Sequence, residues 1–129
     1  MSEIEWAAGL FEGEGSIERW RPTGQGNQQA RLAVSMTDRD VLERFAKIVG
    51  VGKVWGPYQT KSGLNAKGQP YKPMYRWAVV RITDVQRILR DFWPYLGQRR
   101  RARAADVIAG YYESPRRPPG NPRLIGNRS

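Results

Sequence analysis

Residues 6–17 read WAAGLFEGEGSI, and this stretch decides how the rest of the chain is organised. Its apolar side chains recur at helical spacing before a glycine-rich stop at residues 13–15. Ser2 and Glu5 stand three residues apart ahead of this run, a capping-box pattern that predicts where the helix begins. The segment therefore predicts a short helix that passes directly into a strand over residues 15–22.

Two glycines of this helix, Gly9 and Gly13, lie four residues apart and therefore share one face. Each costs about 1 kcal/mol of helix stability relative to alanine, so the bare stripe predicts the close approach of a second backbone. Glu14 stands at the helix C-terminus, where the macrodipole disfavours a carboxylate by about 0.3–1 kcal/mol. A divalent cation would reverse that preference, and Mg²⁺ is bound by carboxylates and carbonyls. A solvated glutamate in a helix stop explains the local pattern equally well.

The segment 7–15, AAGLFEGEG, resembles the LAGLIDADG motif of homing endonucleases. The identical residues are Ala8, Gly9, Leu10 and Gly15, while Glu12 and Glu14 each keep the charge of an aspartate. The resemblance covers roughly residues 2–112. It implies that the motif helix packs against its twin from another motif copy, and that the acid matching Glu14 binds the catalytic metal.

The composition restricts the possible chemistry. Neither cysteine nor histidine occurs, which excludes disulfides, zinc sites built on these residues and histidine general bases. A net charge of +10 over 129 residues indicates a polyanionic partner. We find neither a long apolar run nor a signal-peptide pattern, so we expect no membrane association and no secretion. The expected location is the cytoplasm, in a prokaryote or phage system, or an organelle.

The remaining periodicities predict one α+β domain over residues 1–114 and a basic Pro/Arg-rich tail, expected to be disordered, over residues 115–129. Strands are predicted at 15–22, 28–36, 53–58 and 74–82, with a turn at 23–27, and further helices at 37–49, 83–93 and 97–112. The predicted capping pairs are Thr37 with Asp40 and Thr83 with Gln86, and Gly50 or Gly52 ends the helix at 37–49. This order, α-ββα-ββα(α), fits the LAGLIDADG homing-endonuclease fold, with one antiparallel four-stranded sheet, helices on one face and the other face free.

The free sheet face is predicted to contact DNA. Its expected contact residues are Gln29, Arg31, Ser35, Lys53, Trp55 and Arg76, joined by the loop lysines Lys61, Lys67 and Lys72. The phase of the first strand stays open: either Glu18, Trp20 and Pro22 face outward, as the resemblance favours, or Arg19 and Arg21 do, as composition favours. Core phases are predicted for the tryptophans Trp6, Trp77 and Trp93.

The resemblance also implies roles for single residues. A basic residue near the scissile phosphate matches Arg99, or Arg100 or Arg101 if the register slips, and these last two are also expected to bind phosphates. A residue that orders the water network falls near Asp38. The metal site is expected at Glu14 and Gly13, with Mg²⁺ as the ion and Mn²⁺ or Ca²⁺ able to replace it for binding. The expected dimer interface consists of Ala8, Gly9, Glu12 and Gly13.

The sequence therefore predicts a single-motif, homodimeric endonuclease that makes a staggered double-strand break in a long pseudo-palindromic DNA site. The alternative is a non-cleaving DNA- or RNA-binding protein on the same fold, such as a splicing helper or a regulator. A third hypothesis, a basic ribosome-associated protein, gives no use to the glycine stripe and predicts a monomer.

Overall fold

The computed structural model describes residues 1–21, 27–59 and 62–114. No helix in these ranges is long and apolar enough to cross a membrane. Several sequence predictions lie outside the described residues: Pro22, most of the turn at 23–27, Lys61 and the tail at 115–129.

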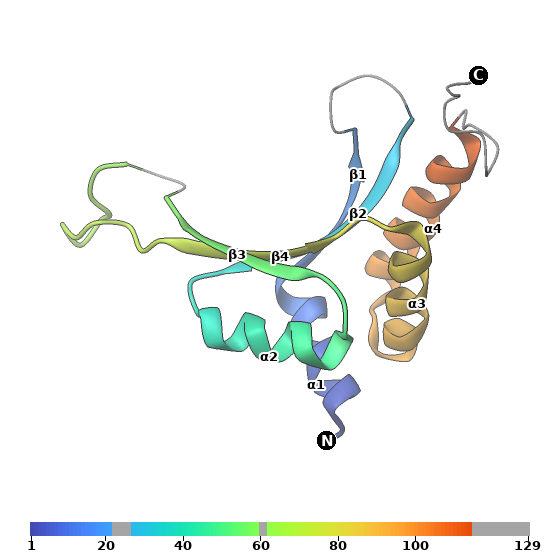
Figure 1. Ribbon diagram of the computed structural model, residues 1–129, viewed down its shortest axis with the longest axis horizontal. Coiled ribbons are helices and arrows are strands. Elements are labelled where there is room, and N and C mark those ends of the chain that lie inside the picture. Colours follow the sequence, from blue (N-terminus) through green and yellow to red (C-terminus); the bar gives the residue numbers. More distant parts are fainter. Residues whose placement is uncertain (22–26, 60–61, 115–129) are drawn as a thin grey trace.

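The elements follow the predicted order. They are α1 (Glu3–Glu14), β1 (Gly15–Trp20), β2 (Gln29–Met36), α2 (Arg39–Val49), β3 (Lys53–Tyr58), β4 (Met74–Val79), α3 (Ile82–Phe92), a 3-10 turn (Trp93–Tyr95) and α4 (Gln98–Glu113). The strands form one antiparallel four-stranded sheet in the order β1-β2-β4-β3. The helices pack on one side of this curved sheet, and none of the described helices covers the other side (Figure 1). The predicted α+β fold is confirmed.

One of the three predicted helix caps is present. The Ser2 backbone N–H donates to Glu5 Oε1 at 3.0 Å, and the Glu5 N–H donates to Ser2 Oγ at 3.1 Å. The Ser2 backbone N–H, as the largest cause, and the Ser2 hydroxyl beside the carboxylate lower the pKa of Glu5. The caps predicted at Thr37 and Thr83 are wrong, because α2 begins after Asp38 and α3 begins at Ile82, which shifts both threonines out of the capping position. Gly50, with a φ of +85°, ends α2.

The core lies between the sheet and the helices and is centred on Trp77, which is fully buried on β4. Phe45 of α2 meets its indole edge-on at 4.8 Å between ring centroids. The indole N–H donates to the Val51 carbonyl at 2.9 Å. A Cβ at Gly52 would lie 2.3 Å from that nitrogen, so only glycine leaves room for this hydrogen bond.

The other two tryptophans predicted to be core residues differ from Trp77. Trp6 is only half-buried, and the Arg44 guanidinium lies 3.9 Å from its ring centroid. The prediction for Trp93 is wrong, because its side chain is 39% exposed. Pro94 ends α3 and starts the 3-10 turn there, which takes Trp93 off the buried face of the helix.

Candidate nucleic-acid interface

Glu18 settles the phase of β1, because its side chain lies on the open face of the sheet together with Arg31 and Arg76. Arg19 points the other way and pairs with Asp106 of α4. The alternation implied by the resemblance is therefore the one present.

A network of four side chains occupies the middle of the open face. Glu18 stands directly opposite Arg31 in the β1/β2 register. Its Oε1 accepts a hydrogen bond from Arg31 Nε at 2.7 Å, and Arg31 Nη2 forms an ion pair with the same oxygen at 2.6 Å. Arg76 Nη2 lies 3.4 Å from both carboxylate oxygens, and Ser16 donates its hydroxyl to Oε2 at 2.6 Å. Partial burial raises the pKa of Glu18, but the hydrogen bonds from Ser16 and Arg31 and the two positive charges outweigh it. The net pKa lies below its ordinary value.

Small side chains form the floor beneath this network. Ala33 and Ala78 face each other across β2 and β4 and are only 2% and 7% exposed, although they belong to the open face. Trp20 completes the cluster, with the Arg31 guanidinium 5.0 Å from its ring centroid. The side chains of Arg31 and Arg76 therefore lie over an alanine-lined part of the sheet.

The predicted DNA-contact residues lie on this open face and on the connection between β3 and β4, as far as the described ranges include them. Strand register places Trp55 opposite Arg76, and Arg76 opposite Ser35, whose hydroxyl accepts from Arg76 Nη1 at 3.2 Å. Lys53 and Trp55 are exposed, whereas Gln29 is half-buried. The strands β3 and β4 extend beyond the helices (Figure 1), and their connection carries the exposed side chains of Lys67 and Lys72.

The motif helix α1 presents an open glycine face. A Cβ added to Gly9 or Gly13 would meet no heavy atom of this chain's described residues within 4 Å. The prediction that Ala8 belongs to the dimer interface is wrong, because Ala8 is fully buried in the chain's own core and cannot reach a second chain. Glu12 is also engaged within the chain, since Oε1 accepts from the N–H of Gly97 at the start of α4 at 3.0 Å.

Glu14 lies at the foot of the glycine face with an exposed side chain. Within the described ranges we find neither a hydrogen bond nor an ion pair that holds its carboxylate, and no group of three or more acidic side chains placed to share a metal ion. One chain therefore contributes one free carboxylate at this point.

The arginine run at the start of α4 lies against the beginning of β1. Arg100 donates to the Gly15 carbonyl, and Arg103 Nε donates to the Ile17 carbonyl at 2.9 Å. Arg101 is held elsewhere, by the Trp93 carbonyl at 3.0 Å. Arg99 is exposed and unengaged among the described residues, and it lines a cavity of about 340 Å³ beside Gly15. Of the candidates for the scissile phosphate, Arg99 has the guanidinium that is free to bind a ligand.

Asp38 lies in a different place. It precedes α2 and lines an open cavity of about 610 Å³ with Asp40, Glu43 and Tyr75. Arg99 lines a separate cavity, so the structure does not bring Asp38 and Arg99 together within one chain.

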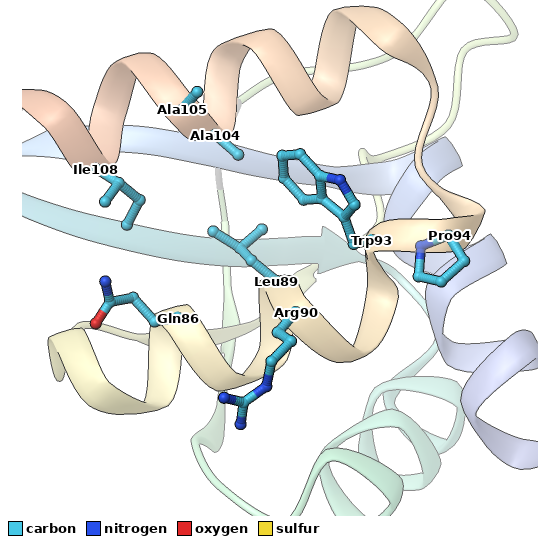
Figure 2. A pocket seen from close by; sticks show the side chains of 8 residues that line it. All are labelled: Gln86, Leu89, Arg90, Trp93, Pro94, Ala104, Ala105 and Ile108. Carbon is cyan, nitrogen blue, oxygen red and sulfur yellow. The ribbon is translucent and has the colours of Figure 1, made fainter.

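An apolar hollow on the helical side was not predicted. It is an open hollow of about 580 Å³ between α3 and α4, and Figure 2 shows Leu89 and Ile108 directed into it with the Trp93 indole at its end. Its sequence signal is the pair of apolar residues Trp93 and Ile108, which line the same hollow because the 3-10 turn connects α3 to α4.

Comparison with known proteins identifies structures that share this fold. No protein-family model matches the chain, and no curated protein does. Among solved structures, the homing endonuclease I-CvuI bound to its target in the presence of Ca matches with a TM-score of 0.62 and 24% identity. The I-CvuI complex with the I-CreI target in the presence of Mg matches with a TM-score of 0.60 and 27% identity. Both alignments cover 83% of this chain but 64% of the I-CvuI chain, so the chain spans less than two thirds of that length.

A third match is the LAGLIDADG meganuclease I-AabMI bound to uncleaved DNA, with a TM-score of 0.62 and 14% identity over 87% of this chain and 36% of that one. These likenesses agree with the motif at residues 7–15 and with the open glycine face of α1. The resemblance seen in the sequence is confirmed, and the chain has the fold of the LAGLIDADG homing endonucleases.

Proposed function

We propose that this chain is a site-specific DNA endonuclease of the homing type that acts as a homodimer. The observation that carries the proposal is the arrangement around Glu14. Its free carboxylate stands at the foot of the open glycine face, and the unengaged Arg99 lines the cavity that opens beside the next residue. The DNA-bound state of the similar structures supports the choice of substrate.

A second copy of the chain completes the site in this proposal. Gly9 and Gly13 leave room for another helix backbone, and a twofold interface brings the same surface of both chains together. The two Glu14 carboxylates then meet near the axis. A dimer of this kind reads a pseudo-palindromic site, each chain contacts one half, and each chain cuts one strand.

The donor set fits a hard divalent cation. Glu14 offers a carboxylate that the described residues leave free, and the backbone carbonyl of Gly13 lies in the last turn of the same helix. Mg²⁺ prefers such oxygen ligands, and Mn²⁺ or Ca²⁺ accept them for binding. Bound between the two chains, the ion would supply the acidification of water and the charge neutralisation that phosphodiester hydrolysis requires.

The chain's own residues have distinct tasks in this proposal. Arg99 binds the scissile phosphate as a permanent positive charge, because a guanidinium stays protonated and cannot serve as a general acid at neutral pH. Asp38 remains the proposed residue for ordering water, supplied from its separate cavity. Lys53, Lys67 and Lys72 anchor phosphates along the open face, so affinity should fall steeply with salt.

One observation favours a second function, that of a DNA- or RNA-binding protein that does not cleave. Asp38 and Arg99 line separate cavities of the single chain, so a complete catalytic set is not visible in it. Such a protein would hold its target equally well in EDTA and would never nick it.

The test is cleavage of a randomised pseudo-palindromic DNA library in Mg²⁺ by the wild-type chain, by Glu14→Gln and by the control Glu3→Gln. Glu3 is an exposed acid of the same helix at its opposite end, so the control removes the same charge away from the site. We expect staggered ends from the wild type and the control but not from Glu14→Gln. Equal enrichment of one DNA sequence by all three proteins, without cleavage, would leave the binding protein as the function. If no DNA is enriched, the whole proposal is wrong.

A further inference from the structure

Glu18 is saturated by donors from its own chain. Oε1 accepts a hydrogen bond from Arg31 Nε and forms an ion pair with Arg31 Nη2, Oε2 accepts from the Ser16 hydroxyl, and Nη2 of Arg76 approaches both oxygens. A carboxylate has about four lone-pair positions, so these contacts fill it. Glu18 is therefore unavailable to a ligand on the open face, and its effect is exerted through the two arginines.

Each arginine keeps donors that the carboxylate does not use. Arg31 spends the Nε/Nη2 edge of its guanidinium on Glu18, and within the described part of the chain its Nη1 makes no hydrogen bond. Trp20 packs on the same guanidinium, which limits its movement further. Arg76 is fixed at two points, by Glu18 and by the Ser35 hydroxyl. Two planar donor groups are thus held in place before any ligand arrives, which reduces the entropy lost on binding.

The surroundings of the pair favour bases over phosphates as the ligand. Arg31 lies on β2 and Arg76 on β4, the two central strands of the sheet, with the alanine floor beneath them. Their two positive charges share one carboxylate, which leaves the three groups with a net charge of only about +1. That weakens them as phosphate anchors but leaves their directional hydrogen bonds intact. In the major groove guanine offers O6 and N7, the acceptor pair that a guanidinium binds in bidentate fashion.

We propose that Arg31 and Arg76 read two consecutive G·C base pairs in each half-site, with Glu18 as the positioning residue that holds both. This inference rests on the proposed function, since it requires that the open face binds DNA. Both guanidiniums contact the same carboxylate, so they lie close together, and neighbouring base pairs are separated by about 3.4 Å along the helix axis. Adjacent base pairs are therefore the ones that the two arginines can reach together.

The experiment is selection of binding sites from a randomised DNA library by the full chain, without cleavage, in Ca²⁺. The proteins are wild type, Glu18→Gln, and the control Asp91→Asn, which breaks the Arg87–Asp91 pair on α3 and changes the charge equally. We expect the wild type and the control to select two adjacent G·C pairs per half-site. In Glu18→Gln the preference at those two positions should fall by about 10-fold or more, while all other positions keep theirs. A thermal melt of each protein confirms that it is folded.

Two further variants locate each contact. Arg31→Gln and Arg76→Gln should each abolish the preference at one of the two adjacent positions and leave the other in place. A phosphate role predicts a different pattern, in which affinity falls uniformly for all sequences and the slope of log affinity against log salt decreases by about 1.

The outcomes distinguish failure of this inference from failure of the proposed function. If the wild type selects a site but Glu18→Gln selects the same bases with unchanged preference, Glu18 does not position the two arginines and this inference is wrong, while the proposed function stands. Uniform weakening in the arginine variants contradicts it as well. If the wild-type chain binds no DNA, both the proposed function and the inference fail.

Discussion

Replacing Gly9 by alanine should stabilise the single chain and weaken the dimer. Gly9 lies in the interior of α1, and an added Cβ would meet none of the described atoms of its own chain within 4 Å. An exposed Gly→Ala change in a helix raises the free energy of unfolding by about 1 kcal/mol. Gly13→Ala, in the last turn of α1, should have the same sign and a smaller size.

The effect on association has the opposite sign. If two α1 helices meet along this face, each added methyl group lies where the backbones approach most closely, and overpacking of a tight contact costs about 1–3 kcal/mol. The dimer dissociation constant should then rise by about 10- to 100-fold. A Gly9→Ala monomer that resists urea better than the wild type and yet dimerises more weakly could not be explained by a change within the single chain.

The assays are sedimentation velocity over a range of protein concentrations and urea denaturation under conditions where the chain is monomeric. Gly15→Ala is the contrasting control, because its Cβ would lie 2.4 Å from the buried Phe11 ring and should destabilise the chain itself. A Gly9→Ala chain that unfolds more easily would refute the open face. An unchanged dissociation constant, or a wild type that stays monomeric, would refute the dimer through α1.

Three other predictions follow from contacts described above. Arg99→Ala should reduce the cleavage rate without changing the melting temperature. Arg100→Ala should reduce cleavage and also lower the free energy of unfolding by about 1 kcal/mol, because the Gly15 carbonyl of β1 loses its donor. Cleavage rates and thermal melts of the two variants test this. Trp77→Phe should lower the free energy of unfolding by about 1–3 kcal/mol, since it removes the indole N–H bonded to Val51 and leaves space in the core; urea denaturation measures this. Because the folded-state pKa of Glu18 is depressed, its stabilising contribution is complete above about pH 4.5 and is lost as the pH falls through the folded pKa, so Glu18→Gln should lose less stability than wild type in an acid titration.

The sequence was sufficient for the elements whose signals are local. The capping box at Ser2, the helical spacing of the apolar residues and the glycine stop together define α1, and alternation defines β2. The order of these elements then leads to the sheet and to its open face. The family motif adds the position of Glu14, which no composition argument could supply.

Features that depend on packing between distant segments could not be predicted from the sequence. Ala8 has the same character whether it faces a second chain or its own core, and only the packing of α1 on the other elements buries it. The phase of β1 was ambiguous because both alternations carry charged residues and the strand is short. Cross-strand register decides it, since it sets Glu18 opposite Arg31. Trp93 was misplaced because α3 ends at Phe92, one residue before the predicted end, and Trp93 therefore belongs to the 3-10 turn.

Arg100 and Arg103 have a consequence for the way in which the protein opens locally. β1 is an edge strand of the sheet, and these two side chains from α4 donate to its carbonyls at Gly15 and Ile17. Fraying of the first turns of α4 would expose that edge, and detachment of β1 would release the same turns. Amide hydrogens of β1 and of the start of α4 should therefore exchange with solvent as one cooperative unit, so that Arg99 keeps its place for as long as the sheet edge stays closed.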